Sequence, residues 1–139
     1  MIDFIDVLGR VLGDFRGTPV EHAGPHIVVL DPRQPEAAAP FVADPASWTL
    51  PGSYELRPLL VVGQNVTALD EVADDCDRAL VEIASILQDF VADETGRPWP
   101  CVDTQKGRTV LEAALVDGHA RWTSRGEPWC GIGALNDRD

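Results

Sequence analysis

Basic residues are scarce in this chain of 139 residues. Eleven Lys and Arg residues, with Lys106 the only lysine, stand against 23 Asp and Glu residues, so the formal net charge at pH 7 is -12. Proteins that hold nucleic acid or an anionic membrane over a broad face need clustered cations, because counterion release drives that binding. The sequence shows no such cluster, and we expect neither tight nucleic-acid binding nor membrane binding.

Long apolar runs and paired cysteines are missing too. No run reaches the ~18 to 20 residues that span a bilayer, and the start MIDFIDVLGR is acidic where a secretory signal peptide is basic. Cys76, Cys101 and Cys130 are an odd number without the spacing of a disulfide framework. These absences predict a protein made in the cytosol and kept in a reducing compartment.

What the chain does have is the composition of one globular unit. It is 45% apolar and 24% charged, which is ordinary for a soluble domain. A chain of this length buries roughly 68% of the surface that its unfolded form exposes. We therefore predict a single domain over residues 1–139, with a core that needs neither metal nor disulfide.

Periodicity predicts two helices and several strands. Apolar residues recur at helical spacing over residues 2–15, including Ile5, and again over about 25 residues that begin with Thr67 as N-cap and carry Cys76 on the apolar stripe. Strands are expected at 26–30, buried on both faces, and at 54–64, where Pro58 marks an edge or a bulge. Later strands are expected at 109–116, 119–123 and 129–135, the first two joined at the hairpin sequence Asp117-Gly118.

Between the first two strands, residues 31–53 contain five prolines, which exclude a regular element. Apolar residues in this stretch favour an arm over residues 33–53 that packs on something. Because strands outnumber helices and hairpins dominate the last third, we predict an α+β fold. In it, a mixed or antiparallel sheet of four to five strands packs against one long helix, beside an N-terminal helix and a long proline-rich loop.

Catalytic and metal-binding patterns are weak. The cysteines lack a CxxC pair, and His22, His26 and His119 lie in different segments, unlike the ligand pairs of zinc sites. We therefore expect no catalytic residue, no cofactor and no metal, and we predict that the chain is not an enzyme. A less favoured alternative is an enzyme that uses Cys101 or Cys130 with His119.

The four tryptophans lie outside both predicted helices. Trp is a common anchor of protein interfaces, although such residues also complete small cores. Together with the apolar arm, they favour a subunit of an assembly, since an arm buried by a neighbour leaves little apolar surface in water. The predicted subunit-interface residues are Phe41, Val42, Trp48, Leu50, Trp122 and Trp129.

The layout of residues 2–92 resembles the tail terminator (tail completion) proteins of long-tailed bacteriophages, especially actinobacterial ones. A leading helix precedes a strand ending near Asp31-Pro32, a proline-rich loop with Trp48, the strand YELRPLLVVG at 54–63, and TALD at 67–70 opening a long helix. The final strands are similar to the closing hairpin of that family, although residues 97–130 match it less well.

The resemblance implies a structural role in the virion. Six copies would form a ring that caps the completed tail tube and meets the head connector, at the head–tail interface of a particle assembled in the host cytoplasm. The partners implied are further copies of the chain, tail-tube proteins and head-connector proteins. An acidic ring wall would repel the phosphates of passing DNA, which agrees with the charge of -12.

A second resemblance concerns the last third. Trp99-Pro100-Cys101, with Gly118, Trp122 and residues 133–135, is similar to the ending of small actinobacterial proteins that carry Cys and His in zinc-knuckle fashion. This chain departs from that pattern, because no His closely follows Cys101 and Ser124 stands where a second Cys is expected. The alternative function is a small cytosolic adaptor or regulatory domain without catalytic activity.

The predicted arm is tested by deleting residues 36–46. If the arm contributes to contacts between copies, the deletion lowers the mass of the protein in solution, measured by light scattering. An unchanged oligomer would reject the arm's part in assembly.

Overall fold

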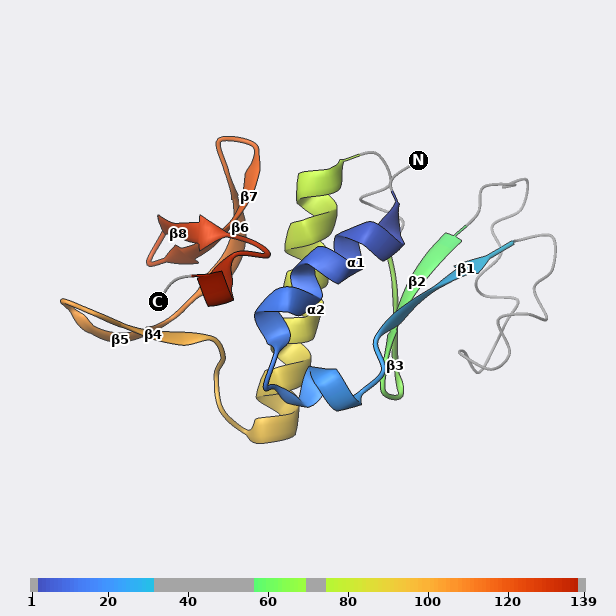
Figure 1. Cartoon of the computed structure of the whole chain (residues 1–139), viewed down its shortest axis with the longest axis horizontal. Coiled ribbons are helices and arrows are strands. Elements are labelled where there is room, and N and C mark those ends of the chain that lie inside the picture. Colours follow the sequence, from blue (N-terminus) through green and yellow to red (C-terminus); the bar gives the residue numbers. More distant parts are fainter. Residues whose placement is uncertain (1–2, 32–56, 70–74, 138–139) are drawn as a thin grey trace.

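The computed structural model describes residues 3–31, 57–69 and 75–137 (Figure 1). Its helices are α1 (Phe4–Leu12) and α2 (Cys76–Thr95), with 3-10 turns η1 (Gly13–Phe15), η2 (Pro19–His22) and η6 (Leu135–Asp137). Its strands are β1 (His26–Leu30), β2 (Arg57–Val62), β3 (Asn65–Ala68), β4 (Cys101–Thr104), β5 (Gly107–Val110), β6 (Glu112–Val116), β7 (His119–Ser124) and β8 (Glu127–Gly131). The predicted α+β class is confirmed.

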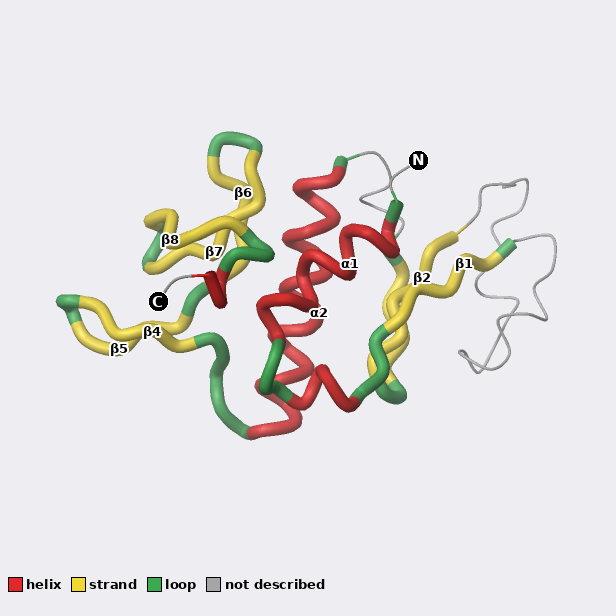
Figure 2. The backbone as a smooth tube through the Cα atoms, viewed as in Figure 1, coloured by secondary structure: helices red, strands yellow, loops and turns green. Residues whose placement is uncertain are grey.

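All strand pairs are antiparallel, and they are divided among three sheets rather than joined in one. The sheets are β1-β2-β3, β4-β5 and β6-β7-β8. Figure 2 shows the first sheet on one side of α2 and the other two on the opposite side. Each described strand therefore pairs only with a strand next to it in sequence, and the long helix lies between the two groups of strands.

Helix α2 begins later than the sequence pattern predicts. The side chain of Asp75 caps it by accepting a hydrogen bond from the backbone N–H of Arg78 at 3.2 Å, and Gly96 ends it with φ 69°. Thr67, the predicted N-cap, lies instead in β3 opposite Leu60, so that prediction is wrong. The β-branched pair at residues 66 and 67 favours an extended strand, while Asp70 lies outside the described residues.

The apolar stripe predicted for the first helix is shifted, and one residue of the stripe predicted for the long helix is exposed. In α1 the buried residues are Phe4, Val7, Leu8 and Val11, whereas Ile5 is 73% exposed. The helix begins after Asp3, whose carboxylate caps the backbone N–H groups of residues 5 and 6, and positions 4, 7, 8 and 11 then share one face. Cys76 is exposed as the first residue of α2, which corrects its predicted place on the buried stripe.

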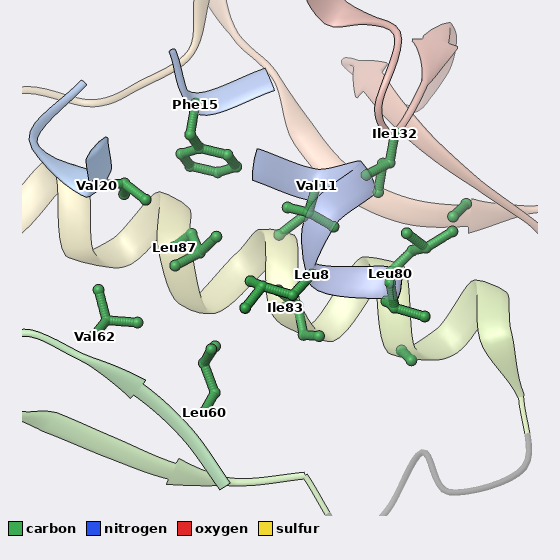
Figure 3. Close-up of a cluster of buried hydrophobic side chains, with 14 of the residues drawn as sticks. Leu8, Val11, Phe15, Val20, Leu60, Val62, Leu80, Ile83, Leu87 and Ile132 are labelled. Atoms are coloured by element: carbon green, nitrogen blue, oxygen red, sulfur yellow. The ribbon is translucent and has the colours of Figure 1, made fainter. Parts of the chain in front are cut away.

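One main core joins elements from both ends of the described chain. Figure 3 shows Ile83 and Leu87 of α2 between α1 and the first sheet, with Val11 on one side and Leu60 on the other. The same cluster extends to Ile132 after β8. A domain of this size depends on such a contiguous core, because burial of apolar surface supplies most of the driving force for folding.

The sheet β1-β2-β3 carries a smaller cluster on its other face, formed around Leu30 and Leu59. The predicted burial of the first strand on both faces is only partly met, because His26 is exposed and Val29 is 52% exposed. Pro58 lies at the end of the pairing with β3, where its carbonyl accepts the N–H of Leu69 at 3.0 Å. On its other side Pro58 lies opposite Val29 within the β1–β2 pairing, so it is on the middle strand of this sheet and not on the edge that the sequence suggested.

The hairpin at Asp117-Gly118 is confirmed. Both residues have positive φ, 52° and 81°, and they join β6 to β7 through the pair Val116 and His119. The strand predicted over 109–116 is broken at Leu111, which is fully buried and donates its N–H to the carbonyl of Pro100 at 2.8 Å. That break creates β4-β5 as a separate hairpin, and the last strand ends at Gly131, before the predicted 135.

The start of α2 can be tested with Asp75→Ala. We expect the free energy of unfolding to fall by about 1 kcal/mol, because the helix loses its capping carboxylate. Asp75→Ser keeps an oxygen that caps equally well and serves as the matched control. Urea denaturation followed by circular dichroism measures both variants, and an alanine variant as stable as the parent would contradict this N-cap.

Candidate assembly interface

Trp122, one of the predicted interface residues, belongs to the core. Its side chain is fully buried, and its indole Nε1 donates a hydrogen bond to Asp14 Oδ2 at 2.8 Å. Its ring centroid lies 6.2 Å from those of Phe15 and of Trp99, the latter in an edge-to-face arrangement. The prediction of Trp122 as a subunit contact is wrong, because the indole is used within the chain.

Asp14 organises the polar part of this core. The carboxylate is 1% exposed, and besides Trp122 it accepts the backbone N–H of Gly133 at 2.6 Å and that of Leu135 at 2.8 Å. A further hydrogen bond joins the same two segments: the side-chain N–H of Asn136 donates to the carbonyl of Gly13 at 2.6 Å. A buried carboxylate is tolerated where several donors surround it. The turn after α1 is thereby fastened to the chain that follows β8.

The sequence offers little warning of this network. Asp14 looks like one of several acidic residues beside the apolar stripe of the first helix. Its three donors lie 108 to 121 positions away, and two of them are backbone groups present in any sequence. Only the packing of the C-terminal segment against η1 brings them together.

The other predicted interface residues have different positions. Trp129 on β8 is half-buried and packs on the edge of the main core, so part of its surface remains accessible. The four predicted contacts in the arm lie outside the described residues: Phe41, Val42, Trp48 and Leu50. Trp99, half-buried, stacks on Phe15 with ring centroids 4.6 Å apart.

Two exposed apolar side chains, which the sequence did not predict as contacts, lie on two different sheets. Val29 is 52% and Leu115 42% exposed. Both lie on edge strands, Val29 on β1 and Leu115 on β6. Edge strands present unpaired backbone N–H and C=O groups and pair readily with other chains unless they carry charges or prolines. Among the described strands, none pairs with the outer side of either edge, and each edge carries one exposed apolar side chain.

The hairpin β4-β5 forms the second distinctive surface. It extends away from the helices at one end of the molecule (Figure 1). Its tip is held by Thr104, whose hydroxyl donates to the carbonyl of Gly107 at 2.7 Å and accepts the N–H of Lys106 at 3.2 Å. Lys106 and Arg108 are exposed there. The hairpin presents an ordered basic tip on a chain that is acidic overall.

A cavity of about 870 Å³ lies beside the C-terminal half of α2. Two carboxylates line it, Glu21 from η2 and Glu94 from α2, together with the half-buried ring of Phe90. Its other described lining residues include His22 but no Lys or Arg. A smaller cavity of about 500 Å³ on the neighbouring surface is lined by Arg97, Arg108 and Trp99, among others. The larger cavity is therefore acidic and can attract a cation, whereas the smaller cavity is basic.

Of the two thiols proposed for an alternative enzyme, Cys130 is not brought within reach of the His119 imidazole. Cys101 starts β4 and its Sγ lies 3.3 Å from the carbonyl oxygen of Pro98, as donor. Cys130 lies opposite Trp122 in the β7–β8 register. Trp122 is three positions from His119 along β7, which separates these two residues by about 10 Å. A nucleophile and its base must lie within hydrogen-bond reach. This arrangement does not favour the thiol enzyme.

Among residues 3–31, 57–69 and 75–137, no group of three or more His, Cys, Asp or Glu side chains is placed to hold a metal ion. None of the described helices combines the length and the apolar character needed to cross a membrane. No protein-family model, curated protein or solved structure matches the chain. The functional argument therefore depends on the surfaces described above.

The role of Asp14 is tested by two substitutions. Asp14→Ala removes the acceptor of three hydrogen bonds, and we expect the free energy of unfolding to fall by about 3 kcal/mol or more. Asp14→Asn keeps one acceptor oxygen and should lose roughly half as much. Chemical denaturation measures both losses.

Glu127→Ala, which removes an exposed carboxylate from β8, is the control and should change stability by less than about 0.5 kcal/mol. An Asp14→Ala variant as stable as this control would show that the network contributes nothing to the fold.

Proposed function

We propose that the chain is a structural virion protein, a tail terminator subunit that forms a homo-oligomeric ring, capping the phage tail tube and joining it to the head connector. The observation that carries the proposal is the exposed apolar surface on two sheet edges, at Val29 and Leu115. Isolated apolar residues are normal on a protein surface. Apolar residues on unpaired edges, however, are a feature that a subunit of an assembly uses.

The order of elements also supports the proposal. The structure runs α1, β1, residues 31–56, β2, β3 and α2, which agrees with the helix, strand, long connection, strand and long helix of the tail terminator resemblance. The added strand β3 and the later start of α2 change the detail of that layout and leave its order intact. The order of secondary-structure elements does not by itself specify a function. The proposal therefore depends more on the exposed sheet edges than on this order.

The charge distribution fits a ring through which DNA passes. The net charge of -12 disfavours the approach of phosphate groups. The exposed basic side chains of β4-β5 are too few to hold nucleic acid over a broad face. The ring would therefore let DNA slide without binding it, and its contacts would be with proteins: further copies of itself, the tail tube and the head connector.

The mass of the full-length protein in solution tests the proposal. We expect light scattering to give several times the 15.1 kDa of one chain, and negative-stain images to show rings, six copies being the number that the resemblance implies. A monomer at all accessible concentrations would contradict the ring and favour the alternative of a small adaptor or regulatory domain.

The part played by the sheet edges is tested with Val29→Lys and Leu115→Lys. Both side chains are exposed, so we expect stability within about 0.5 kcal/mol of the parent. A charge on an edge strand opposes pairing with another chain, and self-association measured by sedimentation should weaken.

Gly9→Lys is the matched control, since it adds the same charge on α1 where a new Cβ meets no atom within 4 Å. If both edge variants assemble like this control, the sheet edges are not the contacts.

A further inference from the structure

We propose that neighbouring copies in the ring are joined head to tail, with the basic tip of β4-β5 of one copy seated in the acidic cavity beside α2 of the next. This inference rests on the proposed ring and deepens it by adding, beside the apolar sheet edges, a charged contact between neighbouring copies. The occupant of the cavity is thus a second copy of this chain, and the contact is made by Lys106 and Arg108 with Glu21 and Glu94.

The hairpin has the form of an insert. Each of its strands has four paired positions, so it is about 13 Å long at 3.3 Å per residue. Its base is fixed by the hydrogen bond from Leu111 to the carbonyl of Pro100, and its tip by Thr104. A two-stranded hairpin standing alone is marginal in water. Ordering at both ends lowers the entropy lost when such a projection binds a partner.

The hairpin is also basic where the chain is acidic. Residues 97–110 contain three cations, Arg97, Lys106 and Arg108, and one acid, Asp103, which lies opposite Arg108 in the register. Within the part of the chain that the structure describes, neither Lys106 nor Arg108 forms an ion pair. Their charges are therefore available to another molecule.

The cavity is large enough for the tip of the hairpin and carries the opposite charge. Its volume of about 870 Å³ lies within the range of roughly 300 to 1,000 Å³ that ligand pockets span. Glu21 and Glu94 are exposed at its walls, where they attract a cation, and the ring of Phe90 offers an aromatic face to a Lys or Arg side chain. His22 also lines the cavity.

The tip and the acidic cavity are two different surfaces of the chain, although Arg108 also lines the smaller cavity, which shares Gly17, Thr18 and Pro19 with the acidic one. In Figure 1 the hairpin extends from one end of the long axis, while η2 and the β2-β3 turn, which line the cavity, lie across α2 from it. A contact between two different patches of the same chain is heterologous, and repeating it builds a ring when the rotation closes. Opposite charges on the two patches also disfavour pairing of like surfaces.

Charge reversal on each surface tests this contact. K106E/R108E makes the tip acidic, and E21K/E94K makes the cavity basic. In each variant alone, like charges meet, and we expect self-association measured by analytical ultracentrifugation to weaken by about tenfold or more. An equimolar mixture of the two variants restores opposite charges at every contact and should restore the ring, which also shows that both variants fold.

The control R78E/R125E makes the same change in net charge as K106E/R108E, at two exposed arginines that lie outside β4-β5 and line neither cavity, and it should assemble like the wild type. Assembly of either reversed variant at wild-type strength, or failure of the mixture to restore it, would overturn this contact while a wild-type ring still supports the proposed function. A wild-type monomer would overturn both.

Discussion

The described structure depends on one buried carboxylate. Asp14 receives hydrogen bonds from the indole of Trp122 and from two backbone N–H groups after β8, so the turn that ends α1 and the last segment of the described chain share one acceptor. Apolar contacts alone are not directional and would tolerate several arrangements of these segments. A buried charge with three fixed donors tolerates few, because any displacement leaves polar groups unpaired.

This constraint explains why the third sheet lies against the helices rather than beside the first sheet. Trp122 is held in the core next to Phe15, so β7 must run close to the helices. Helix α2 then separates the strands of the first sheet from those of the third. The β4-β5 hairpin, which follows α2 and precedes Leu111, is left outside the core and extends from the molecule. The surface features used in the proposals are consequences of this division.

Some site features were readable from the sequence and some were not. The acidic charge and the Asp117-Gly118 turn follow from local composition and from the backbone preference of a two-residue hairpin. The interface assignment of Trp122 was wrong because Trp serves equally well as a core residue or as an anchor, and only its neighbours distinguish the two. Lys106 and Arg108 were not predicted as a contact, because two cations in a sequence form no cluster until a hairpin places them together at a projecting tip.

By itself the sequence determined the α+β class, the single long helix, the hairpin at residues 117 and 118, and the net charge, since periodicity, turn chemistry and ionisation are local properties. Only the tertiary structure decided how the strands divide into three sheets, where α2 begins, that Trp122 is internal, and which edges stay open. The internal position of Trp122 depends on a contact with Asp14, a residue more than 100 positions away. No local pattern encodes such contacts, because the energy that selects them exists only when the whole core packs.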